Sequence, residues 1–276
     1  MTERRQGDRR LVEGRRTEVR LAAIADVHCP KTGGGSLQPL FAQAAASADI
    51  LLLAGDLTAY GLPEEAQTLA KELTTAAKIP ILAVLGNHEY EAGREEEIER
   101  ILTDIGVTVL DGGSCELLGI GFAGVKGFGG GFDERALEPW GEPTMKQFVQ
   151  DAVQETLKLG SALARLRTLH KIALVHYAPI QATVEGEPRE IYPFLGSSRL
   201  AEPIDRYKAT AVFHGHAHHG RPEGRTRGDV PVFNVAWSLL QRLYPDRPPF
   251  RLFTIPVNPA DVPEPAAPGV RALNQP

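Results

Sequence analysis

The feature that most constrains the fold is an alternation of short apolar runs with helical segments between residues 20 and 110. The strand-like runs cover residues 20–25, 50–54, 81–85 and 107–110. The segments with apolar residues at helical spacing cover residues 37–48, 63–77 and 95–105. A strand followed by a helix and then another strand is typical of a βαβ unit, so this part of the chain predicts a mainly parallel sheet.

Beyond residue 110 the alternation breaks. Two short runs, residues 115–118 and 120–125, predict a strand pair that belongs to another sheet. A long helix is predicted over residues 145–169, with Gly160 as a weak point. The remaining predictions are strands at residues 171–175, 210–213, 230–235 and 250–255, a helix at 198–207, a charged turn at 220–229 and a long functional loop at 177–198.

Composition indicates one globular domain in a reducing compartment. The chain has 276 residues, of which 42% are hydrophobic and 24% charged. Its two cysteines, Cys29 and Cys115, do not suggest a disulfide framework. No apolar run approaches the roughly 20 residues that a membrane-spanning helix needs. We therefore expect a cytoplasmic protein without a membrane partner.

The net charge of −5 gives no general attraction for polyanions. Nucleic acid is therefore not the expected partner, and a phosphate-bearing substrate has to be held by local charge, for instance by metal ions. Residues 1–19 are predicted to be a flexible leader, residues 20–256 the domain and residues 257–276 a disordered tail. The arginines near the start of the chain are interleaved with acids, so a nucleic-acid-binding or partner-binding arm is the weaker interpretation.

Polar side chains that can bind metal ions follow five of the predicted strands. They are Asp26, His28, Asp56, Asn87, His88, His176, His216 and His218. Carboxyl ends of strands are where open α/β sheets keep their ligand sites. Residues two apart in an extended chain face the same side, so Asp26 and His28 can hold one ion together. The mixture of nitrogen and oxygen ligands suits manganese, iron or zinc better than calcium or magnesium alone.

These residues occur in ordered motifs, which are Asp26-Val27-His28, Gly55-Asp56, Gly86-Asn87-His88, His176 and Gly215-His216-Ala217-His218. The set resembles the calcineurin-like metallophosphoesterase family, and the resemblance runs from residue 26 to residue 218. It implies an α/β fold, a four-layer α/β/β/α sandwich with two mixed β-sheets. The alternation of strands and helices does not give this fold by itself.

The resemblance also implies a role for each residue. One divalent ion (Mn, Fe or Zn) is expected on Asp26, His28, Asp56 and His218, and a second on Asp56, Asn87, His176 and His216. Asp56 then bridges the two ions. His88 is left off the metals as the proton donor to the leaving oxygen and a contact for the phosphate, which makes His88 and Asn87 the expected catalytic residues. The implied activity is hydrolysis of phosphate esters by metal-activated hydroxide.

Departures from neighbouring subfamilies narrow the expected substrate. Asp56 is followed by Leu57 and Thr58 rather than by the Asp-Arg-Gly of the serine/threonine protein phosphatases, and Cys29 replaces a glycine. The chain also lacks the added domain of the nuclease relatives. We expect a small phosphomonoester or phosphodiester, cyclic nucleotides included. The alternatives are a non-catalytic protein-binding module on the same fold and a nuclease.

Several residues near the motifs have predicted roles outside the ligand set. His214 and His219 are expected in packing or solvent contact, His170 on the surface at a helix end, and Cys29 as a small apolar filler. Glu89 either orients His88 or faces solvent. The loop at residues 128–132 is either a lid or a plain turn, and Arg189 and Tyr192 are candidates for substrate contact. The substrate, the native metals and the oligomeric state are not determined by the sequence.

Overall fold

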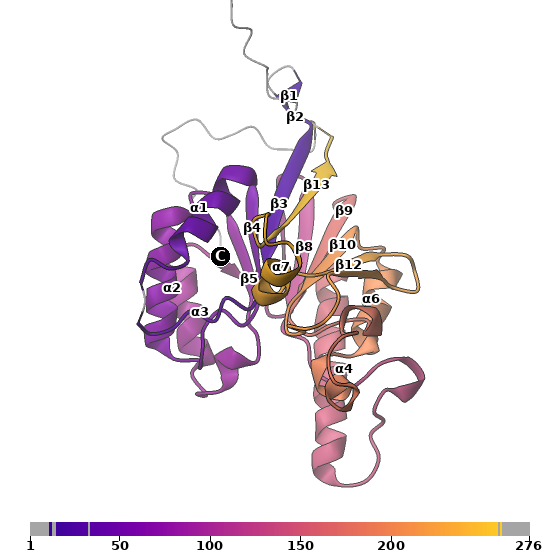
Figure 1. Cartoon of the computed structure of the whole chain (residues 1–276). Coiled ribbons are helices and arrows are strands. Elements are labelled where there is room, and N and C mark those ends of the chain that lie inside the picture. The colour runs from indigo at the N-terminus through magenta and orange to yellow at the C-terminus, as the bar shows by residue number, and fades with distance from the viewer. Residues whose placement is uncertain (1–10, 13–14, 33, 259, 261–276) are drawn as a thin grey trace, which may run out of the picture.

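Two β-sheets packed face to face form the centre of the molecule, and helices cover the outer face of each sheet (Figure 1). The computed structural model describes residues 11–12, 15–32, 34–258 and 260. The arrangement confirms the predicted α/β/β/α sandwich with two mixed sheets.

The first sheet carries the predicted alternation of strands and helices. Its five strands lie in the order β13-β3-β4-β5-β6. They are β3 (Glu18–Ile24), β4 (Ile50–Ala54), β5 (Ile81–Val84), β6 (Thr108–Val109) and β13 (Arg251–Pro256). Its helices are α1 (Gln38–Ser47), α2 (Pro63–Ala76) and α3 (Glu95–Asp104). All of its strands are parallel except β13, which pairs with β3 in the antiparallel direction.

The second sheet has six strands in the order β11-β12-β10-β9-β8-β7. They are β7 (Gly113–Leu117), β8 (Ile120–Val125), β9 (His170–Val175), β10 (Ala211–His214), β11 (Glu223–Arg225) and β12 (Pro231–Asn234). Its four inner strands are parallel, and the edge strands β7 and β11 are antiparallel to their neighbours. The predicted strand pair after residue 110 is therefore confirmed as β7 and β8. Helices α4 (Pro143–Arg165) and α6 (Ala201–Arg206) lie on the outer side of this sheet (Figure 1).

Strand β4 shows why the strands of the first sheet read as continuous apolar runs. Leu52 packs between the two sheets in one cluster with Phe122 and Phe213. Leu51 points to the opposite face and packs beneath the helices with Phe41. Because successive side chains of a strand alternate between faces, a strand covered on both sides needs an apolar residue at every position. Each fully buried leucine contributes about 1.5–3 kcal/mol.

The long helix differs from its prediction at the C-terminal end. It ends at Arg165 because Leu166 is extended and the chain then enters β9 at His170. The prediction of His170 at a helix end is therefore wrong. Gly160 does not break α4. A Cβ there would lie 3.5 Å from Pro203, so this glycine faces α6.

Short elements account for most of the other differences. The predicted loop at residues 177–198 contains η3 (Gln181–Thr183), η4 (Arg189–Ile191) and α5 (Tyr192–Leu195). The predicted helix at 198–207 is η5 (Ser198–Leu200) followed by α6. The predicted turn at 220–229 contains β11. Helix α7 (Trp237–Leu243) was not predicted. Two short 3₁₀ turns, η1 (His88–Tyr90) and η2 (Asp133–Arg135), were not predicted either.

The ends of the chain were predicted to be a leader and a tail. Most of residues 1–19 and 257–276 lie outside the described residues. The described part of the leader contributes β1 (Leu11–Val12), β2 (Arg15–Arg16) and the first residues of β3. Among the described residues, no helix combines the length and the hydrophobicity of a membrane-spanning segment.

Candidate metal centre

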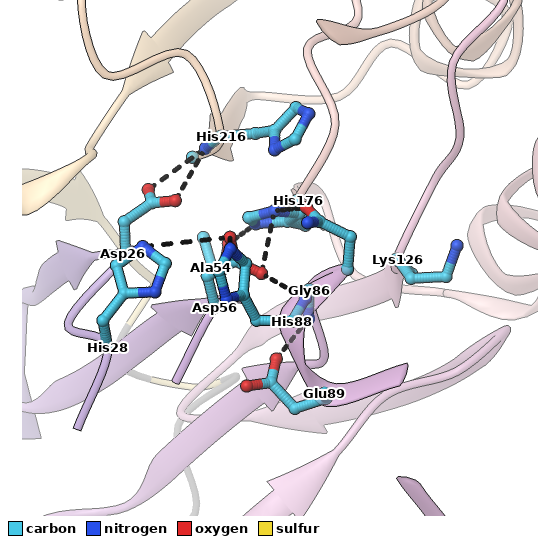
Figure 2. Close-up of polar contacts among 12 residues, drawn as sticks. Asp26, His28, Ala54, Asp56, Gly86, His88, Glu89, Lys126, His176 and His216 are labelled. Carbon is cyan, nitrogen blue, oxygen red and sulfur yellow. Dashed lines mark hydrogen bonds and ion pairs between the residues drawn. The ribbon is translucent and has the colours of Figure 1, made fainter. Parts of the chain in front are cut away.

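The predicted ligand residues meet where strands of both sheets end. β3, β4 and β5 deliver Asp26, Asp56 and Asn87 to one edge, while β9 and β10 of the second sheet end shortly before His176 and His216. Backbone hydrogen bonds join these ends: Asp26 N–H donates to Gly55 O at 3.0 Å, and Gly215 N–H donates to His176 O at 3.1 Å. Figure 2 shows Asp26, His28, Asp56, His176 and His216 gathered in one site.

Four of the predicted ligands have an unusual backbone conformation. The φ angles are 57° at Asp26, 41° at His28, 48° at Asp56 and 69° at His216. Left-handed φ is costly for residues with a side chain, and it persists at functional sites because surrounding contacts hold it. Here His28 N–H donates to Asp56 O at 3.0 Å, so one strained turn supports the other.

The glycines that precede the ligands are required by close packing. A Cβ at Gly86 would lie 2.1 Å from Asp56 Oδ1, and a Cβ at Gly215 would lie 2.4 Å from Asp26 Oδ2. Neither distance leaves room for a carbon atom. The glycines of these motifs therefore let a neighbouring strand end bring its carboxylate into the site.

One group of ligand atoms comes from Asp26, His28 and His218, all within 4.8 Å of one another. Asp26 Oδ1 lies 3.0 Å from His218 Nε2, and it also accepts a hydrogen bond from His216 N–H at 3.0 Å. His28 Nε2 is buried and has no hydrogen-bond partner among the described residues. It lies 4.0 Å from Asp56 Oδ2. A buried nitrogen without a partner, facing carboxylates, fits a metal ligand.

A second group comes from Asp56, His176 and His216, whose ligand atoms also lie within 4.8 Å of one another. His176 Nδ1 donates to Ala54 O at 2.9 Å, which directs its Nε2 toward Asp56 Oδ1 at 3.3 Å and Asn87 Oδ1 at 3.0 Å. Two oxygen atoms with lone pairs then face Nε2, which carries a proton at neutral pH and becomes a third lone-pair donor when a metal cation takes the place of that proton. This arrangement favours a positive charge between them, so the residues fit a metal cation.

The pKa values follow from the same geometry. Burial alone raises the pKa of Asp56, but the charge of His176 and hydrogen bonds from His176 and His88 N–H hold it well below its usual range. Burial lowers the pKa of His176, and the charge and hydrogen bond of Asp56 outweigh that effect and raise it to about 9. Burial, together with the neighbouring His176, lowers the pKa of His216 to about 4. Asp56 is thus a carboxylate and His216 a neutral imidazole at neutral pH.

His88 lies close to both groups. Its Nδ1 donates to Ala59 O at 2.6 Å, which leaves Nε2 directed into the site, 3.8 Å from Asp56 Oδ2. The ligand atoms of His28, Asp56 and His88 lie within 4.8 Å of one another. The His28 ring packs edge-on against the His88 ring, with centroids 4.5 Å apart. These distances alone allow His88 to be a ligand or a proton donor.

The family model for calcineurin-like phosphoesterases matches residues 19–220, a span that contains every predicted ligand. The chain belongs to the calcineurin-like phosphoesterase family. Membership makes it a metal-dependent hydrolase, in agreement with the donor set described above.

Solved structures share the fold of this phosphoesterase. The phosphopantetheinyl hydrolase of Mycobacterium tuberculosis aligns over 86% of this chain and 96% of its own, with a TM-score of 0.62 and 18% identity. The TT1561 protein of Thermus thermophilus aligns over 88% of this chain and 100% of its own, with a TM-score of 0.53 and 18% identity. At these identities the likeness establishes the fold alone. A search of curated protein sequences gave no match.

Glu89 has a position that neither sequence alternative described. Its side chain is fully buried, so the solvent-facing alternative is wrong. The carboxylate accepts hydrogen bonds from Gly86 N–H at 2.6 Å and from the N–H and hydroxyl of Thr58, both at 2.7 Å. Glu89 of the phosphoesterase therefore ties the turn that follows β4 to the turn that follows β5. Gly86 lies three residues before Glu89, whereas Thr58 lies 31 residues before it. The contact with Thr58 forms only on folding and leaves no local sequence pattern.

The other nearby residues fall outside the ligand groups found in the described chain. His214 is buried, with Nε2 2.8 Å from the Thr183 hydroxyl, whereas His219 is exposed. Cys29 is 1% exposed and belongs to the apolar cluster beneath the helices, which confirms its prediction as a filler. Burial raises the pKa of its thiol to about 12, so it is protonated at neutral pH.

Lys126 is the residue near the site that the sequence analysis missed. It follows β8, and its carbonyl accepts a hydrogen bond from His176 N–H at 2.9 Å (Figure 2). Its ammonium group lies 5.1 Å, 4.8 Å and 5.3 Å from the ring centroids of Tyr90, Phe128 and Tyr177. The available signal was its position, since Lys126 directly follows a predicted strand as the ligands do.

Proposed function

We propose that this phosphoesterase hydrolyses small phosphomonoesters or phosphodiesters, cyclic nucleotides included, at a centre of two divalent ions. The observation that carries the proposal is the convergence of Asp56 Oδ1 and Asn87 Oδ1 on His176 Nε2, at 3.3 Å and 3.0 Å. Oxygen and nitrogen donors of this kind suit manganese, iron or zinc.

We assign one ion to Asp26, His28, Asp56 and His218, and the other to Asp56, Asn87, His176 and His216. The grouping of Asp26 with His28 and His218, and of Asp56 with His176 and His216, supports this division. Asp56 is the carboxylate shared by both, since its Oδ1 faces His176 and its Oδ2 faces His28.

When bound, two such ions act as Lewis acids that lower the pKa of water and stabilise negative charge on a phosphoryl group. The protein supplies fixed ligands and a proton. His88 is held by Ala59 O through Nδ1, so Nε2 is the atom that carries a proton to the leaving oxygen. Edge-on packing against His28 fixes the plane of the His88 ring. Asn87, the preceding residue, has no side-chain group that titrates near neutral pH. We assign it as a metal ligand that helps to position the phosphoryl group.

The surroundings of Asp56 support a small substrate rather than a phosphoprotein. Thr58 is fully buried and bonded to Glu89, so no cationic side chain extends from this turn toward a substrate. The net charge of −5 gives no support to nucleic acid as a substrate. We further propose a cytoplasmic location, which the free Cys29 and Cys115 support.

The direct test is hydrolysis of two chromogenic esters, p-nitrophenyl phosphate and bis(p-nitrophenyl) phosphate. Protein stripped with a chelator and dialysed is assayed before and after addition of Mn²⁺. We expect release of p-nitrophenolate from at least one ester after Mn²⁺ addition and loss of that activity on renewed chelation. Absence of turnover on both esters, with Mn²⁺, Fe²⁺ and Zn²⁺ each supplied, contradicts the proposal and leaves the binding-module alternative.

The nuclease alternative has its own readout. A nuclease is expected to bind DNA more tightly as the salt concentration falls. Fluorescence anisotropy with labelled single-stranded and double-stranded DNA at low salt measures this directly. Absence of binding rules out the nuclease.

A further inference from the structure

A cavity of about 760 Å³ has a wall that is hydrogen-bonded to the turn carrying the candidate ligands His216 and His218. Its walls come from residues 131–135, residues 181–193 and Arg221. The turn that carries His216 and His218 is bonded to these walls: Glu187, which lines the cavity, accepts a hydrogen bond from His219 N–H at 2.6 Å. His216 Nε2 lies 3.1 Å from the carbonyl of Phe194, the residue after the lining Pro193. A cavity of this size is in the range of small-molecule sites.

The charges of the cavity walls are unequal. Three arginines, Arg135, Arg189 and Arg221, line the cavity together with two acids, Glu185 and Glu187. Glu185 lies 3.0 Å from Arg221 and neutralises it. Within the described residues, the guanidinium groups of Arg135 and Arg189 have no ion-pair partner, which leaves the walls with one excess positive charge. This excess is notable in a chain whose net charge is −5.

The two unpaired arginines sit beside an apolar wall. Phe132 is 3% exposed and packs edge-on against Tyr192, with centroids 6.4 Å apart, and Pro193 extends the same surface. Guanidinium groups present parallel N–H donors that match the oxygens of a phosphate. An aromatic and proline surface suits the organic body of a small ligand. The cavity therefore combines a site for an anionic group with a site for the body that carries it.

We propose that this cavity binds a second phosphate group of the ester that is hydrolysed at the metal centre. The inference rests on the proposed function and deepens it, because it assigns a preference for small bisphosphorylated substrates over monophosphorylated ones. Arg135 and Arg189 are the contacts for the second phosphate. Phe132, Tyr192 and Pro193 contact the part of the substrate between the two phosphates.

The test compares a series of alkanediol bisphosphates, from ethanediol to hexanediol, with butyl phosphate as the monophosphate. Phosphate release by the Mn²⁺-loaded protein gives kcat/KM for each ester. We expect a chain length at which the bisphosphate is preferred by at least about tenfold, the value of one charge-assisted hydrogen-bond pair. Arg135→Gln and Arg189→Gln should each reduce that preference toward the statistical factor of about two that follows from two equivalent ends.

Arg206→Gln is the matched control, because Arg206 is an exposed arginine of α6 outside the cavity. It should keep the full preference. The inference is overturned if no bisphosphate is preferred at any chain length, or if the cavity variants keep the same preference as the control.

Calorimetry separates this inference from the proposed function. Butanediol bisphosphate and hexanediol bisphosphate are titrated into the Mn²⁺-loaded protein and into both cavity variants. If no ester is hydrolysed, the proposed function fails, yet tighter binding to the wild type than to the variants still supports the cavity assignment. Equal affinities in wild type and variants overturn the assignment whether or not turnover occurs.

Discussion

The side chains of the centre are oriented by backbone carbonyls. His176 and His88 both place Nδ1–H on a carbonyl, of Ala54 and Ala59 respectively, and thereby direct Nε2 into the site. Such a second contact fixes the tautomer and the ring orientation of a histidine before any ligand arrives. Two histidines oriented in the same way can still have different roles. Only His176 is fully buried, with its Nε2 facing the side-chain oxygens of Asp56 and Asn87.

The roles assigned to His88 and to the metal ligands predict different effects of substitution on metal content and turnover. His88→Ala should keep the metal content of the wild type and lower turnover about 10² to 10⁴-fold, the usual contribution of general acid catalysis. Turnover of the better chromogenic ester and metal analysis of the same sample measure both quantities. His219→Ala, at an exposed histidine outside the ligand groups, is the control. Loss of metal from His88→Ala would make this residue a ligand instead.

His214 predicts a pH dependence of stability. Burial lowers the pKa of His214 to about 4, against an ordinary value of 6.5. The unfolded chain therefore binds a proton at higher pH than the folded protein. The stability that the neutral His214 contributes is present above pH 6.5 and is lost as the pH falls toward 4. At pH 5 the loss amounts to about 2 kcal/mol.

Urea unfolding at pH 7.5 and pH 5, in the presence of a chelator, measures this contribution. The free energy of unfolding should fall by about 2 kcal/mol more in the wild type than in His214→Gln, which cannot titrate at this position. His170→Gln, at the half-buried start of β9, should behave as the wild type. An equal fall in wild type and His214→Gln would show that His214 is not the group responsible.

At the scale of the elements, the centre is built from turns that follow strands. Glu89 holds two of these turns together through Gly86 and Thr58. The glycines allow the turns to approach, since a Cβ at Gly86 would lie 2.3 Å from the backbone nitrogen of Asp56. The turns therefore depend on one another, and a change in one should displace a ligand in the next.

Gly86→Ala tests this dependence. The added methyl group should displace Asp56, so the variant should lose most of its bound metal and at least about 10²-fold in turnover. Gly34→Ala is the matched control, because a Cβ at Gly34 meets nothing within 4 Å. Full metal content in Gly86→Ala would contradict the packing argument.

The local sequence pattern predicted those elements that are determined by the burial of their own side chains. The predicted bounds of the strand at residues 50–54 agree with β4, because every position of this strand is buried. Residues 177–198 show where pattern fails, since their short helices are fixed by distant contacts such as the bridge between Ala178 and Gly196 and the hydrogen bond of Ser197 N–H to Ala178 O. Edge strand β11 is similar, because its three residues are a strand only through pairing with β12.

The candidate site was predictable to the extent that its residues form short motifs at strand ends. The sequence motifs supplied all the residues that the structure gathers into ligand groups, while the partners of Glu89 and the cation–π contacts of Lys126 arise only on folding. The motifs do not distinguish the role of His88 from that of the ligand histidines, and on folding His88 comes within ligand distance of His28 and Asp56.

At the scale of the whole molecule, the centre joins the two sheets. The first sheet supplies Asp26, His28, Asp56 and Asn87, and the second supplies His176, His216 and His218. An ion held by ligands from both sheets binds the folded protein and not the unfolded chain. By linkage, each ion at a concentration of 100 times its Kd stabilises the fold by about 2.7 kcal/mol.

Metal removal should therefore lower the melting temperature. For a domain of this size we expect a fall of roughly 5 °C or more when Mn²⁺ is replaced by a chelator. Differential scanning calorimetry at matched ionic strength measures the shift, and Gly34→Ala should show the same shift as the wild type. Identical melting temperatures with and without Mn²⁺ would contradict a site that spans the sheets.

In the proposed centre one carboxylate, Asp56, is shared by two metal ions. Inductively coupled plasma mass spectrometry after equilibration with Mn²⁺ and removal of free metal gives the number of ions per chain. We expect two ions in the wild type and at most one in Asp56→Asn, with circular dichroism showing that the variant is folded. Fewer than two ions in the wild type, or two ions retained by folded Asp56→Asn, would contradict it.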